Sequence, residues 1–173
     1  MSRGVGTHNY SQTKKKKNIY HSKILIKGNT FKNLYDAGAY LMNWKNTKIL
    51  NNRFIKNGKG NNLTSTNTGH AISGSGVKNI TITGNHFKQI KKNPINFNGQ
   101  ENVGNGAGAY TRIYVYITKK EAEKMLDNTS EKCGNDPKFP GYDVVYFRND
   151  GRRTKENAVG INFAKQKVNF NIE

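Results

Sequence analysis

The chain has 173 residues and a mass of 19.5 kDa, which is enough for one ordinary domain or two small ones. Only 34% of the residues are hydrophobic, but aromatic residues make up 10%, which argues against a disordered chain. The single cysteine, Cys133, excludes an intrachain disulfide and a multi-cysteine zinc site. No apolar run approaches the roughly 18 residues of a transmembrane helix. We also expect no secretory signal, because the first twenty residues carry basic side chains without an apolar stretch.

Charge is distributed unevenly along the chain. Residues 1–100 hold 17 basic residues and a single acid, Asp36, for a net charge of +16. Residues 101–173 hold 12 basic and 10 acidic residues, for a net charge of +2. The asymmetry indicates two regions, and the first favours a polyanionic partner such as nucleic acid, teichoic acid, acidic polysaccharide or an anionic membrane surface. The alternative is a solubilising charge that follows from a composition rich in lysine and asparagine.

A short repeat occurs three times in the first hundred residues, at 24–31, 47–54 and 80–87. Each copy has an isoleucine three residues before an asparagine and a phenylalanine two residues after it. The asparagines are 23 and 33 residues apart, and a polar insertion at residues 57–70, which we expect to be a loop, accounts for the longer interval. A period of this length with insertions confined to loops indicates a solenoid.

The repeat favours β-strands over helices. Its segments are short, alternating and rich in β-branched residues, and a second apolar strand is predicted after each copy, at 39–41, 71–73 and 95–97. Equivalent side chains of a parallel coil stack about 4.8 Å apart, and asparagine at a turn can bond the layers above and below. The predicted stacks are Ile26, Ile49 and Ile82; Phe31, Phe54 and Phe87; and Asn29, Asn52 and Asn85.

The pattern Ile-x-Ile-x-Gly-Asn-x-Phe resembles the right-handed parallel β-helix of the pectate-lyase-like superfamily, and its asparagines are similar to that family's asparagine ladder. The composition and residues 4–10 are most similar to bacteriophage tail-spike and tail-fibre proteins. The resemblance covers residues 4–100 and implies an all-β fold with about three rungs. It also implies a homotrimer in the virion. Because three rungs make a marginal solenoid, the chain is either part of a longer β-helix or buries its edges against other copies.

Residues 101–173 are expected to form a small α+β or β-rich domain that caps the coil, trimerises or contacts a receptor. A glycine-rich joint at 99–108 precedes a predicted strand at 110–117. Thr118 and Glu121 form a capping box for a helix from 119 to about 128. Further strands are predicted at 143–148, 159–163 and 167–172.

Few residues suit catalysis. Glycoside hydrolysis uses two carboxylates and calcium-dependent lyases use acidic clusters, whereas the basic region offers only Asp36. Metal-free β-elimination needs a base, and the spacing does not select among the candidates, which are His8, Tyr10, His21, His70 and His86. No two His or Cys residues have a metal-ligand spacing, so neither a metal nor a cofactor is expected. We expect Cys133 to be a structural thiol.

These observations favour a binding module. No nucleic-acid-binding motif is present, so nucleic acid is expected to bind only nonspecifically, and no membrane insertion is expected. The predicted ligand is an anionic cell-surface glycopolymer, either teichoic acid or capsular polysaccharide. The alternatives are a polysaccharide lyase or depolymerase acting on the same polymer, and a fragment without activity. The predicted ligand-binding residues are Tyr40, Trp44, Arg53, Tyr110, Tyr114 and Tyr116.

Overall fold

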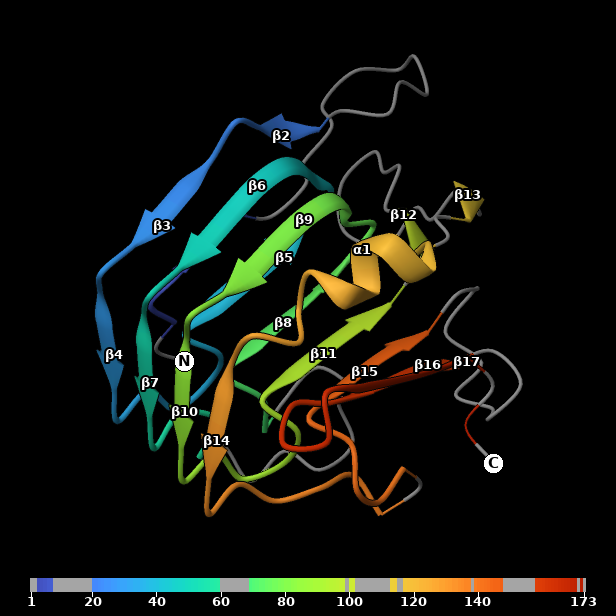
Figure 1. Ribbon diagram of the computed structural model, residues 1–173. Coiled ribbons are helices and arrows are strands. Elements are labelled where there is room, and N and C mark those ends of the chain that lie inside the picture. Colours follow the sequence, from blue (N-terminus) through green and yellow to red (C-terminus); the bar gives the residue numbers. More distant parts are fainter. Residues whose placement is uncertain are drawn as a thin grey trace.

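A computed structural model describes most of the chain (Figure 1). The described residues are 3–7, 20–59, 69–98, 100–101, 113–114, 117–137, 139–147, 158–170 and 172. They form an all-β structure with parallel sheets and one short helix, so the predicted all-β class is confirmed.

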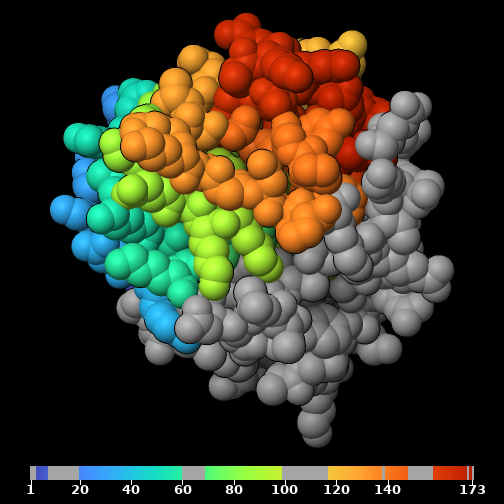
Figure 2. Space-filling model, turned by 90° about the horizontal axis from the view of Figure 1, so that it is seen from below, coloured from blue at the N-terminus to red at the C-terminus, as the bar shows by residue number. Residues whose placement is uncertain are grey.

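The chain runs three times through the same three sheets. The first pass contains β3 (Leu25–Lys27), β4 (Thr30–Lys32) and β5 (Ala39–Met42). The second contains β6 (Trp44–Leu50), β7 (Arg53–Ile55) and β8 (Ile72–Ser75), and the third contains β9 (Lys78–Thr83), β10 (His86–Lys88) and β11 (Ile95–Asn98). Each strand pairs in parallel with its equivalent in the next pass. The passes therefore lie side by side, as the colour bands of Figure 2 show.

Shorter elements extend these sheets. On the first-pass side, β1 (Val5–Gly6) pairs with β5, and β2 (His21–Ser22) pairs with β6. Beyond the third pass, β14 (Thr129–Glu131) pairs in parallel with β10, and β15 (Val144–Phe147) with β11. The antiparallel strands β16 (Ala158–Asn162) and β17 (Lys167–Phe170) continue the latter sheet. The remaining elements are the pair β12 (Gln100–Glu101) and β13 (Ile113–Tyr114), and the helix α1 (Lys119–Glu123).

A ladder of asparagine side chains joins successive passes at the turn between the first two sheets. The Asn52 Oδ1 atom accepts hydrogen bonds from the backbone N–H and the Nδ2 of Asn29, at 2.9 and 3.2 Å. Asn85 accepts from Asn52 in the same way, at 2.8 and 3.0 Å, and Asn128 from Asn85, at 3.0 Å for both. Each acceptor's own Nδ2 donates to a carbonyl of the preceding pass, at 2.9 Å, on Ile26, Ile49 and Ile82.

Apolar stacks fill the interior beside the ladder. The rings of Phe31 and Phe54 are 4.9 Å apart between centroids and nearly parallel, and those of Phe54 and Phe87 are 5.1 Å apart. Ile26, Ile49 and Ile82 are likewise in register. The stack requires a glycine at position 38, because a Cβ added there would lie 2.6 Å from Cδ1 of Phe54.

Left-handed backbone conformations recur at equivalent positions of successive passes. One such set has positive φ at Lys23, Asn46 and Asn79, with values of 57°, 52° and 47°. Another joins Gly28, Asn51 and Gly84, with values of 70°, 54° and 67°. Glycine adopts this conformation without strain, and asparagine tolerates it better than most residues. These turns account for part of the asparagine and glycine content.

The elements after residue 117 differ in part from the sequence prediction. The capping box is confirmed, because the Glu121 backbone N–H donates to the Thr118 hydroxyl and the Thr118 backbone N–H donates to the Glu121 carboxylate. The helix, however, ends at Glu123 rather than near 128, because Asn128 joins the ladder and the backbone must be extended from Thr129. Strands β15 and β17 confirm two predicted strands with shorter bounds, and β16 confirms the third, shifted by one residue towards the N-terminus.

The domain boundary at residue 100 stays a prediction. Strands β14 and β15 lie beyond it in sequence, yet they pair with β10 and β11 before it. The predicted joint at 99–108 lies outside the described residues except for 100–101. Of the predicted strand at 110–117, only 113–114 and 117 are described.

Replacing a buried ladder asparagine by alanine should destabilise the fold much more than replacing the exposed one at the end of the ladder. Replacing Asn85, which is 1% exposed, by Ala would leave the Asn52 N–H and the Ile49 carbonyl without their amide partner. We expect Asn85→Ala to lower the free energy of unfolding in urea by about 2–4 kcal/mol. The matched variant Asn29→Ala, at the exposed end, should cost less than about 1 kcal/mol. Equal losses in the two variants would contradict the structural role assigned to the ladder.

Candidate polyanion-binding face

Strand alternation places basic side chains on the outside of two adjacent sheets. In β3 and β4, Ile26 and Phe31 face inward while Lys27 and Lys32 are exposed. We call the outer side of β3, β6, β9, β4, β7 and β10, with the turns that join them, the basic face. Residues 20–34, 44–57 and 78–90, which form it, contain no Asp or Glu. Their lysines and arginine are Lys23, Lys27, Lys32, Lys45, Lys48, Arg53, Lys56, Lys78 and Lys88.

The register spreads most of these cations over different positions of neighbouring strands, and Lys45 and Lys78 are the pair at equivalent positions. Neighbouring strands are about 4.8 Å apart, so side chains on equivalent positions are near neighbours. Arg53 lies between Thr30 and His86 in this register, and Ile55 lies between Lys32 and Lys88. Lys45 and Lys78 both lie over the ring of Tyr20, at 5.1 and 4.7 Å from its centroid, and partial burial lowers the pKa of Lys78.

Asp36, the acid of the first hundred residues, does not neutralise the cations of the basic face. Asp36 is buried and forms an ion pair with Arg3, with the Nε and Oδ2 atoms 2.7 Å apart. Its charge is therefore compensated by Arg3. The cations of the basic face consequently produce a one-signed field that attracts polyanions.

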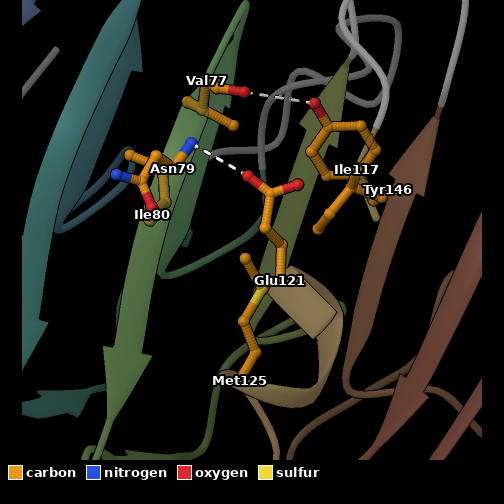
Figure 3. Close-up of a pocket in the computed structure, with 7 residues that line it drawn as sticks. All are labelled: Val77, Asn79, Ile80, Ile117, Glu121, Met125 and Tyr146. Atoms are coloured by element: carbon orange, nitrogen blue, oxygen red, sulfur yellow. Dashed lines mark hydrogen bonds between the residues drawn. The ribbon is translucent and has the colours of Figure 1, made fainter. Parts of the chain in front are cut away.

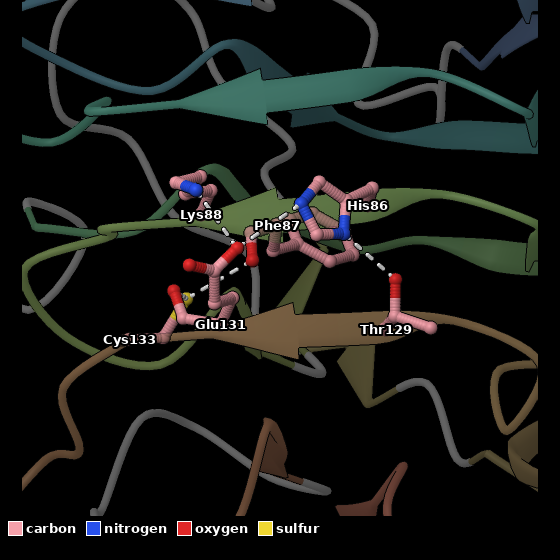
Figure 4. A network of polar contacts seen from close by, with 6 residues as sticks. All are labelled: His86, Phe87, Lys88, Thr129, Glu131 and Cys133. Atoms are coloured by element: carbon pink, nitrogen blue, oxygen red, sulfur yellow. Dashed lines mark hydrogen bonds and ion pairs between the residues drawn. The ribbon is translucent and has the colours of Figure 1, made fainter.

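Acidic side chains border the face beyond the third pass. Glu121 and Asp127 accept hydrogen bonds from Asn79 and Thr83 of β9, and Glu131 lies on β14 (Figure 4). Lys88 Nζ donates to Glu131 Oε2 at 2.9 Å, and His86 Nε2 lies 3.9 Å from the same oxygen. His86 Nδ1 is 2.8 Å from the hydroxyl of Thr129. The hydrogen bond from Lys88, with its charge, lowers the pKa of Glu131 below the ordinary range. Glu131 thus marks the limit of the basic face.

Cys133 lies beneath this edge and has the surroundings of a structural thiol. Its Sγ is 3.5 Å from the Phe87 carbonyl oxygen and 3.6 Å from that of Glu131, and the thiol donates to both. Burial raises its pKa, which disfavours the nucleophilic thiolate.

Of the residues predicted to act on a ligand, Arg53 and His86 are brought together. They occupy equivalent positions on β7 and β10 and both reach the surface. Four others lie outside the described residues: His8, Tyr10, Tyr110 and Tyr116. For Tyr114, only the backbone position in β13 is described.

Three predicted residues lie inside the molecule instead of on its surface. Trp44 is 1% exposed and packs in the core, where its indole N–H donates to the Thr7 hydroxyl. The left-handed turn at Asn46 interrupts the strand alternation, so Trp44 and Thr47 both face inward, which the sequence pattern could not show. This burial argues against Trp44 as one of the ligand-binding residues.

Tyr40 and His70 are also enclosed. Tyr40 is 9% exposed, and the Arg3 guanidinium lies 4.0 Å from the centre of its ring. His70 is fully buried, and its Nδ1 is 2.9 Å from the Asn93 carbonyl oxygen. Both side chains are packed against protein, so neither is placed to meet a polymer at the surface.

The sequence analysis did not find Asn128 and Glu131. Asn128 completes the ladder, but it has neither the preceding isoleucine pair nor a phenylalanine two residues later. Ser130 stands at the phenylalanine position, and the ring of Phe163 packs on Phe87 instead, with centroids 6.0 Å apart. Because that ring comes from a distant segment, Asn128 itself was the remaining signal of a fourth layer in the sequence.

A small cavity between α1 and β9 is too small to be a ligand site (Figure 3). Its volume is about 10 Å³, enough for one water molecule. The Tyr146 hydroxyl donates to the Val77 carbonyl at 3.3 Å, and the backbone N–H of Asn79 donates to Glu121 Oε1 at 3.3 Å. The second of these bonds fastens α1 to β9.

Within the described ranges, no group of three or more His, Cys, Asp or Glu side chains could hold a metal ion. No described helix has the length and apolar character needed to cross a membrane. No protein-family model matches the sequence, and neither a curated protein nor a solved structure matches it. The basic face is thus the strongest candidate that the geometry offers.

The ion pair at the edge of this face predicts a measurable pKa change. Replacing Lys88 by Met should raise the pKa of Glu131 towards its ordinary value, as measured by NMR titration of the side-chain carboxyl. Because the folded pKa is lowered, the pair stabilises the fold above the unfolded pKa of Glu131. This contribution is lost as the pH falls through the folded pKa. The control is Lys32→Met, on β4, two strands from Lys88, which should leave the pKa of Glu131 unchanged. An equal shift of that pKa in both variants would contradict a specific pair between Lys88 and Glu131.

Proposed function

We propose that this chain binds an anionic cell-surface glycopolymer, teichoic acid or capsular polysaccharide, through the basic face. The observation that carries the proposal is the presence of nine Lys and Arg residues and no acid in the segments that form this face. Six of the nine are exposed: Lys23, Lys27, Lys32, Lys48, Arg53 and Lys56. A polymer with repeating negative charge would meet a cation at successive layers.

We further propose that the three passes form a right-handed parallel β-helix of the tail-spike type. The parallel sheets, the asparagine ladder and the stacked phenylalanines support it, and parallel crossovers are almost always right-handed. The proposal extends to a homotrimer carried by the virion, which rests on the resemblance of the repeat to phage proteins.

The shape of the basic face favours a glycopolymer over specific recognition of nucleic acid. The face consists of strands, and the one described helix, with five residues, is not among them. It therefore presents no helix that could enter the major groove of DNA. Exposed amides such as those of Asn33, Asn46 and Asn79 add donors and acceptors that suit sugar hydroxyls.

Charge reversal on the basic face tests the proposal. The variant Lys32→Glu/Arg53→Glu/Lys56→Glu should reduce retention on immobilised wall teichoic acid by at least about tenfold. The control Lys124→Glu/Lys165→Glu/Lys167→Glu changes the net charge equally at exposed positions of the C-terminal segment and should reduce it less than about threefold. Wild-type retention should also fall as salt is raised from about 50 to 300 mM.

Equal losses in the two variants would show that net charge alone drives retention, and would contradict a binding face. The same incubation tests the enzymatic alternative, in which His86 beside Arg53 would act as the base. Unsaturated or shortened products that form at catalytic turnover, and that disappear in His86→Ala, would establish a lyase in place of a binding module.

A further inference from the structure

The two ends of the asparagine ladder are not equivalent. In each layer the asparagine backbone N–H and Nδ2 donate to Oδ1 of the asparagine in the next pass. At the last layer the donors of Asn128 have partners in the preceding turn of the chain. Its backbone N–H donates to the Leu126 carbonyl at 2.9 Å, and its Nδ2 donates to the Met125 carbonyl at 2.7 Å. The ring of Phe163 also covers Phe87 there. That end of the ladder is closed.

The first end is open. In the described part of the chain, no group donates to Oδ1 of Asn29, and no strand pairs with the outer edges of β3 and β4. These strands lie at one margin of the stack (Figure 1), and Leu25 on β3 is 60% exposed. A strand added here would continue the ladder instead of competing with it.

The inner layers define which backbone groups face the open edge. The N–H of Arg53 donates to the Asn29 carbonyl at 2.8 Å, that of His86 to Asn52 and that of Thr129 to Asn85, both at 2.9 Å. Thr30 is the equivalent residue in the first pass, so its N–H points to the place of a preceding layer. The Lys48 N–H donates to the Ile24 carbonyl of the preceding pass, and Leu25 is the register partner of Lys48. The Leu25 N–H therefore also points to the open edge.

We infer that the outer edge of β3 and β4 is a docking site for an extended acidic strand of a partner protein. The edge carries Lys23, Lys27 and Lys32, all exposed, and residues 20–34 contain no acid. Alternating Asp or Glu side chains on the added strand would lie opposite these lysines, while its inward residues would extend the apolar stacks. The strand's own asparagine N–H and side-chain amide would donate to Asn29 Oδ1.

Charge decides against a second copy of this chain as the occupant. Two such edges paired face to face would bring their lysines together, which is unfavourable. Stacking of the opposite end on this edge is disfavoured as well, because the donors of Asn128 are already used. Residues 8–19 of the same chain carry four lysines and no acid, so their charge does not match either.

A designed peptide and a proline variant test the inference. The peptide repeats residues 48–55 with the outward residues Lys48, Leu50, Arg53 and Ile55 each replaced by Glu, giving Glu-Ile-Glu-Asn-Asn-Glu-Phe-Glu. Binding to the isotope-labelled chain is followed by NMR. We expect the acidic peptide to bind at least about tenfold more tightly than the unmodified 48–55 peptide or a scrambled acidic peptide. The shifted amides should include Leu25 and Thr30.

Thr30→Pro removes the outward N–H and keeps the inward hydrogen bonds of β4, since proline is tolerated on an edge strand whose N–H faces solvent. It should weaken peptide binding by at least about tenfold, whereas the matched Thr30→Ala, which keeps the N–H, should stay within about twofold. If Thr30→Pro does not fold, as judged by circular dichroism, Asn29→Ala removes the acceptor Oδ1 and should weaken binding by about fivefold.

Several outcomes would overturn the inference. These are absence of binding by the acidic peptide, equal binding by its scrambled form, and equal affinity in the proline and alanine variants. Self-association of the chain that Thr30→Pro abolishes, detected by light scattering, would assign the edge to a second copy instead. The two proposals fail separately, because peptide binding by Thr30→Pro and Thr30→Ala reports on the backbone edge of β3 and β4, whereas retention on teichoic acid reports on the cations, which neither variant removes.

Discussion

The structure depends on one hydrogen-bonded interaction, the donation from each ladder asparagine to the amide oxygen of the next. A bend between two sheets leaves backbone N–H and carbonyl groups without strand partners, and burying them unpaired is costly. Asn52 and Asn85 are each 1% exposed and satisfy the groups of two passes at once. The same bonds set the register that aligns Ile26 with Ile49 and Phe31 with Phe54.

The ladder also determines where charge is displayed. Once the isoleucines and phenylalanines are held inward, strand alternation sends the intervening residues outward on every pass. The basic face is therefore a consequence of the inward stacks, although its cations, unlike the core residues, stand at different positions on successive passes. At β14 the outward residue is Glu131, which is bonded to Lys88, and the face ends.

The polarity of the ladder gives the molecule one closed and one open end. Met125, Leu126 and Phe163 supply the groups that terminate the last layer. The first layer has no such group among the described residues, and exposed lysines surround it. Lysine on a free edge opposes pairing between two such edges, and the same charge would favour the acidic strand that we infer to dock there.

The sequence by itself determined the features that repeat locally. The spacing of Ile, Asn and Phe predicted the strands and the residues that stack, because in-register parallel strands bring equivalent positions together. Alternation likewise placed Arg53 outside. Tertiary structure alone decided what depends on distant segments or on a break in alternation. Trp44 faces inward because the backbone at Asn46 is left-handed. Asn128 joins the ladder, but the aromatic ring that covers Phe87 in this layer comes from Phe163, far along the chain. A one-dimensional pattern carries neither fact, since each arises from chain geometry between the residues concerned.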